Sequence, residues 1–68
     1  MILDDELNTQ LQKEITRISY FAEGLSEPSK SRALESLQLG RQALDSNSRR
    51  MKIDTLALLR LVTTSTAN

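Results

Sequence analysis

Residues 51–62, with the sequence MKIDTLALLRLV, form the densest apolar stretch of the chain and constrain its fold most strongly. Eight of these twelve residues are apolar, and on a helix at about 100° per residue their side chains point almost all the way round. A surface helix normally has one apolar stripe, whereas a helix that is apolar all round is covered on more than one side. We therefore expect a helix that packs on its own chain with one face and meets a partner with another.

The first third of the chain carries a clear amphipathic pattern. Its apolar residues fall within a sector of about 120° on a helix, and they are Leu3, Leu7, Leu11, Ile15, Ile18, Phe21, Ala22 and Leu25. The acidic residues 4–6 would occupy the first turn, where negative charge complements the helix dipole. We predict a helix from about Asp4 to Glu23, followed by a turn in which Gly24 takes the left-handed conformation.

The organisation of the second half depends on the polar segment at residues 45–48, DSNS. Four poor helix formers in a row indicate a break with a new N-cap. The apolar line nevertheless continues in phase across this segment, with a spacing of seven, at Leu37, Leu44, Met51 and Leu58. We predict an all-α fold, a helical hairpin with a long second arm that is kinked near residues 45–48, and keep a three-helix bundle as the alternative. Residues 1–63 would form a single helical domain, and residues 64–68 a frayed polar tail.

Four residues are candidates for binding a partner protein. Ile53, Leu56 and Leu59 lie on the outward face of the last helix if the opposite line, through Met51, Leu58 and Val62, faces inward. Tyr20 projects almost opposite the stripe of the first helix, and tyrosine is enriched at protein interfaces. A single exposed aromatic residue is also common on ordinary surfaces, so this alternative stays open for Tyr20.

The composition argues against several classes of function. The chain has 68 residues with no histidine and no cysteine, so the usual general base, thiol nucleophile and transition-metal ligands are absent. We expect no catalytic residue, metal site or cofactor, and hence no enzyme. Nine basic and nine acidic residues balance, which gives no general attraction to nucleic acid or to an anionic membrane. We expect neither of these partners, nor a small-molecule substrate.

The zero net charge conceals an asymmetry along the chain. Residues 1–27 hold six acids and two bases, a net charge of −4, whereas residues 28–68 hold seven bases and three acids, a net charge of +4. Halves of opposite sign can fold together or pair head to tail in a dimer. The longest apolar run is far shorter than the roughly 18 residues of a membrane span, and the N-terminus opens with acids, so we expect a cytoplasmic protein.

Two families resemble this chain. One amphipathic helix, a short turn at residues 26–29 and a second arm ending in an apolar helix make most of the chain similar to the small E-type (YscE-like) co-chaperones of type III secretion needle subunits. That resemblance implies a cytoplasmic helical hairpin that helps to keep an aggregation-prone needle protein monomeric within a heteromeric complex. Residues 37–62 also resemble flagellar-type anti-sigma factors, with Ala43-Leu44, Asn47 and Met51-Lys52-Ile53-Asp54 carrying the likeness.

The pattern of apolar faces and both resemblances favour a small helical binding module. We expect a chaperone-like adaptor that masks an apolar surface of a partner protein. The alternatives are an anti-sigma-like regulator that occludes a transcription factor, and a self-associating helical structural protein. The partner would then be either another protein or a second copy of the chain.

Overall fold

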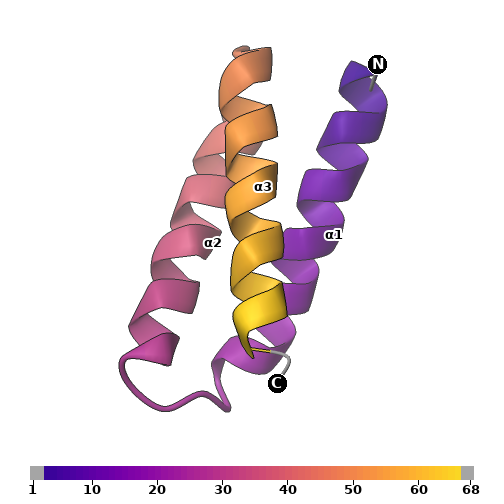
Figure 1. The fold of residues 1–68 in the computed structure, drawn as a ribbon. Helices are drawn as coiled ribbons and strands as arrows, with labels where there is room; N and C mark the ends of the chain where they lie inside the picture. The colour runs from indigo at the N-terminus through magenta and orange to yellow at the C-terminus, as the bar shows by residue number, and fades with distance from the viewer. Residues whose placement is uncertain (1–2, 67–68) are drawn as a thin grey trace.

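Three helices pack side by side in the computed structural model, which describes residues 3–66 (Figure 1). They are α1 (Asp4–Ala22), α2 (Ser29–Asp45) and α3 (Arg49–Thr66). α2 runs antiparallel to the other two, so α1 begins at one end of the bundle and α3 ends at the other. The predicted all-α class is confirmed, and the arrangement is the three-helix bundle rather than the two-armed hairpin.

The first helix forms where the amphipathic pattern predicts it. The apolar stripe is buried at Leu7, Leu11, Ile15, Ile18 and Ala22, with Phe21 and Leu25 packed against the core, while Leu3 is exposed. The helix stops one residue earlier than expected, and the N–H of Gly24 donates to the carbonyl of Phe21 at 3.1 Å. The expected left-handed conformation of Gly24 is wrong, because no described glycine has a positive φ.

The polar segment after α2 is a true break. Ser46 ends α2 in an extended conformation, and its hydroxyl oxygen accepts a hydrogen bond from the N–H of Ser48 at 2.9 Å. The hydroxyl oxygen of Ser48 in turn accepts from the N–H of Met51 at 3.2 Å, which caps the N-terminus of α3. α3 then continues through Thr66 and so includes residues 64–66 of the expected tail, whereas residues 67–68 lie outside the described part of the chain.

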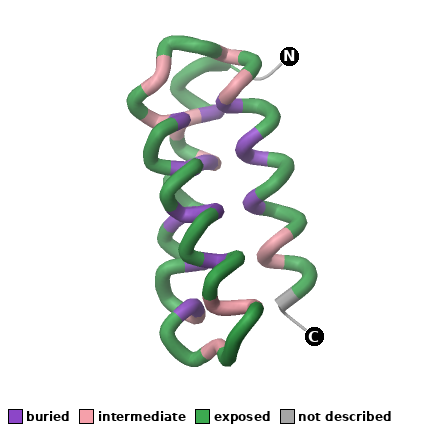
Figure 2. The backbone as a smooth tube through the Cα atoms, turned by 90° about the vertical axis from the view of Figure 1, so that its left-hand side faces the viewer, coloured by how far each residue is buried: buried purple, intermediate pink, exposed green. Residues whose placement is uncertain are grey.

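The core lies between the facing sides of all three helices (Figure 2). Its buried apolar residues are Leu7, Leu11, Ile15, Ile18 and Ala22 of α1, Ala33, Leu37 and Ala43 of α2, and Leu56 and Leu59 of α3. Gly40 of α2 packs against side chains of both other helices, Ile15 of α1 and Leu59 of α3. A β-carbon built on Gly40 would lie 2.9 Å from Cγ1 of Ile15 and 3.2 Å from Cδ1 of Leu59.

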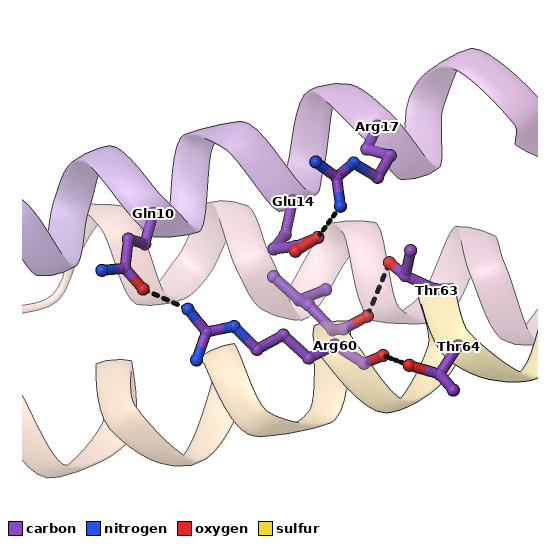
Figure 3. Close-up of polar contacts among 7 residues, drawn as sticks. Gln10, Glu14, Arg17, Arg60, Thr63 and Thr64 are labelled. Atoms are coloured by element: carbon purple, nitrogen blue, oxygen red, sulfur yellow. Dashed lines mark hydrogen bonds and ion pairs between the residues drawn. The ribbon is translucent and has the colours of Figure 1, made fainter.

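Polar side chains join the two parallel helices, α1 and α3. Near the start of both helices, Arg49 donates to Asp4 at 2.6 Å, and the ammonium of Lys52 donates to the amide oxygen of Asn8 at 2.6 Å. Further along, Arg60 donates to the amide oxygen of Gln10 (Figure 3). The acidic first turn of α1 thus lies beside the basic first turn of α3, which shows how the two oppositely charged halves fold together. We call this set of contacts the α1–α3 seam.

Candidate functional site

A groove open to solvent runs between α2 and α3. It has a volume of about 450 Å³ and is lined by Ser29, Arg32, Glu35, Ser36 and Leu39 of α2 and by Leu58, Leu61, Val62 and Ser65 of α3. We call it the α2–α3 groove. The α1–α3 seam does not contribute to it, because none of the lining residues belongs to α1.

Three leucines give the α2–α3 groove its apolar character. The exposed fractions are 41% for Leu39, 37% for Leu58 and 64% for Leu61. Val62 is half-buried and packs against the core beneath them. Single exposed leucines are ordinary on a protein surface, and here three of them, from two helices, border one hollow.

Two charged side chains of the groove have no partner among the described residues 3–66. Arg32 and Glu35 are exposed, and neither side chain forms a hydrogen bond or an ion pair with another residue in the described range 3–66. Elsewhere in the bundle some charges are paired, as in Arg50–Asp54 at 3.9 Å, and others, such as Arg41, have no side-chain partner within residues 3–66. The hydroxyl of Ser36 is engaged within α2, where it donates to the carbonyl of Arg32 at 2.8 Å. The free charges of the groove are therefore one cation and one anion.

The structure corrects two of the four candidate binding residues. Leu56 and Leu59 were expected to face outward, but their exposed fractions are 4% and 0%, and both belong to the core. The expected inward line is also wrong at Leu58, which is exposed and lines the groove. The inward face of α3 instead includes Lys52 and Thr55, which are buried beside the two leucines.

The other two candidates are exposed, but the structure does not bring them to the groove. Ile53 lies on the surface of α3 outside the α2–α3 groove. Tyr20 is 91% exposed and borders a shallow depression formed by α1 alone, together with Lys13, Arg17 and Phe21. A partner role for either residue stays a prediction.

None of the nine residues that line the groove was predicted as a binding residue, and two of its leucines belong to neither apolar face that the sequence predicts. Leu39 lies off the line through Leu37 and Gly40, and it was therefore not considered as part of any apolar face. Leu61 belongs to the apolar run of residues 51–62, but the predicted phase of that run assigned it to neither face. The polar segment at residues 45–48 was the sequence feature that could have prevented this error for α3. A break there means that the inward face of α3 cannot be deduced from the inward face of α2.

Within residues 3–66 there is no group of three or more acidic side chains placed to hold a metal ion. None of the three helices in this range combines the length and the apolar character of a membrane span. Comparisons with protein-family models, with curated proteins and with solved structures found no match to this chain.

Proposed function

We propose that this chain is a chaperone-like adaptor that holds an amphipathic helix of a partner protein in the α2–α3 groove. One observation carries the proposal, namely that Leu39, Leu58 and Leu61 meet from two helices around one hollow surface. Burying these leucines under the apolar face of another helix removes their side chains from water, which is the main source of free energy in such contacts.

The dimensions of the groove fit one helix. On α2 the lining runs from Ser29 to Leu39, which at about 1.5 Å per residue corresponds to about 15 Å. That length accommodates roughly three turns of a bound helix, enough for apolar anchors one and two turns apart. Arg32 and Glu35, the charged residues that line the groove, suit a bound helix whose apolar stripe is flanked by both acids and bases.

The resemblance to the type III secretion co-chaperones suggests a kind of partner. An aggregation-prone subunit with an amphipathic helix would be kept monomeric if that helix were covered by the α2–α3 groove. The adaptor would act by occupying the apolar face that the subunit otherwise uses for assembly. This mechanism needs no catalytic group and no cofactor.

A synthetic peptide tests the groove directly. The probe is a fluorescein-labelled amphipathic helix of about 14 residues, with leucines one turn apart and with lysine and glutamate elsewhere. We expect fluorescence anisotropy to show saturable binding of this peptide and none of a scrambled peptide of the same composition. Leu61→Glu should weaken binding at least about tenfold, because a charge in the groove has to be desolvated.

The matched control is Leu34→Glu, which places the same charge on an exposed leucine of α2 outside the groove. This variant should bind the peptide like the unaltered chain, and both variants should keep their helical circular dichroism. Equal binding of the scrambled peptide, or equal loss of binding in both variants, would show that the groove is not the site.

A further inference from the structure

Arg32 and Glu35 determine what kind of surface the α2–α3 groove can accept. They lie three residues apart on one helix, so both project along the same side of α2. Neither has a partner within residues 3–66 although both border an apolar hollow. A surface that covers the leucines and also pairs both charges must present an anion opposite Arg32 and a cation opposite Glu35.

We propose that in the free chain this surface is supplied by a second copy, in a two-fold symmetric dimer that closes the α2–α3 groove of both copies. At a two-fold interface, residue i of one copy faces residue j of the other, and j faces i. With the two α2 helices antiparallel across the axis, Arg32 of each copy faces Glu35 of the other. The pattern of one base and one acid three residues apart is thus complementary to itself.

The size and charge of the molecule agree with this dimer. The Cα atoms extend over 35 × 19 × 16 Å, and the groove, which runs between two helices, lies along a long side of the bundle. The net charge of zero gives no long-range repulsion between copies. Helical domains of this size have a small core and are commonly stabilised by association.

The dimer rests on the proposed function only in that both use the α2–α3 groove. A partner helix and a second copy compete for the same leucines, so the dimer would protect the apolar groove until a partner displaces it. The adaptor would then exchange one apolar contact for another without exposing the groove to water. Peptide binding is measured below the dissociation constant of the dimer, where the groove is open, and self-association is measured without peptide, so either proposal can fail without the other.

Exchanging the two charges gives a specific test. Arg32→Glu leaves two acids on the rim and Glu35→Arg leaves two bases, so each variant places like charges opposite one another in its own dimer. Sedimentation velocity over a range of concentrations should show a monomer–dimer equilibrium for the unaltered chain. The dissociation constant should rise about tenfold or more in each single variant.

Two combinations should restore association. An equimolar mixture of the two single variants should form a heterodimer, because all four charges then face opposite charges. The double variant Arg32→Glu/Glu35→Arg should associate like the unaltered chain. The control is Arg41→Glu, which makes the same charge change on an exposed residue of α2 outside the groove and should leave association unchanged.

A chain that stays monomeric at all concentrations would overturn the dimer, and peptide binding would then decide the adaptor function alone. A dimer that ignores the charge exchanges, or that responds equally to Arg41→Glu, would also overturn it, because its interface would lie elsewhere. A dimer that follows the exchanges while the peptide fails to bind would support the two-fold interface and refute the adaptor.

Discussion

At Gly40, two side chains reach into the space that a β-carbon would occupy. Ile15 Cγ1 would lie 2.9 Å and Leu59 Cδ1 3.2 Å from that carbon, so the helix of which Gly40 is part can approach both neighbours closely. Gly24 presents the opposite case, because its nearest neighbour, the carbonyl oxygen of Phe21, would lie 3.7 Å from an added β-carbon. Alanine substitutions at the two glycines therefore distinguish the effect of packing on stability, at Gly40, from the effect of backbone flexibility, at Gly24.

Gly40→Ala should lower the free energy of unfolding by about 1 kcal/mol. Alanine gains about 1 kcal/mol in helix propensity, but overfilling a packed core costs roughly 1–3 kcal/mol. Gly24→Ala has no such contact and no positive φ to lose, so it should be neutral or stabilise by up to about 1 kcal/mol. Urea denaturation of both variants checks the pair, and a stabilised Gly40→Ala would mean that Ile15 and Leu59 move aside freely.

At the scale of the elements, the sequence predicted α1 well and the orientation of α3 poorly. The stripe of α1 is continuous and lies within one helix, so Leu11, Ile15 and Ile18 are buried as expected. The faces of α3 were assigned by carrying the phase of α2 through residues 45–48. Three of these residues, 46–48, are not helical, so the rotation of α3 about its axis is no longer tied to α2 and is set by packing.

This explains why Leu56 and Leu59, which were predicted to face outward, are buried, and why Leu58, which was predicted to face inward, is exposed. The local composition could indicate a break, but it could not specify the rotation of α3 about its axis after the break, because that rotation depends on tertiary contacts. Those contacts include the ion pair of Arg49 with Asp4, which lies 45 residues away in the sequence. The pairing also offsets the unfavourable position of Arg49 in the first turn of α3, where a cation lies at the positive end of the helix dipole.

The start of α3 gives a prediction for an element. Ser48→Ala removes the hydroxyl that accepts from the N–H of Met51 and should cost about 1 kcal/mol of stability. Asn47→Ala is the control, since Asn47 is exposed and its side chain makes no hydrogen bond within residues 3–66. Thermal unfolding followed by circular dichroism compares the two, and equal melting temperatures would indicate that the cap contributes nothing.

At the scale of the whole molecule, the core within residues 3–66 consists of ten buried apolar residues from three short helices. A core of this size supplies a net stability of only about 3–5 kcal/mol. A single buried charge costs several kcal/mol or more, which is comparable to the whole of that stability. A charge placed in the core part of α3 should therefore prevent folding, whereas a charge placed in its groove part should affect binding only.

Leu56→Glu should unfold the chain, whereas Leu61→Glu should leave it folded. Leu56 is 4% exposed and Leu61 is 64% exposed, although both belong to the same apolar run. Far-ultraviolet circular dichroism and the dispersion of amide proton shifts distinguish the two outcomes. If Leu56→Glu kept native helicity and dispersion, the packing of α3 described above would be incorrect.

The odd number of helices also has a mechanical consequence. α1 begins and α3 ends at opposite ends of a bundle that is 35 Å long. Tension between these two ends acts along the helix axes, so α1 and α3 would have to slide past one another lengthwise. The contacts Asp4–Arg49, Asn8–Lys52 and Gln10–Arg60 are then loaded together rather than one after another. A tether attached at these two ends would pull this small bundle in shear, the geometry in which such contacts share a load.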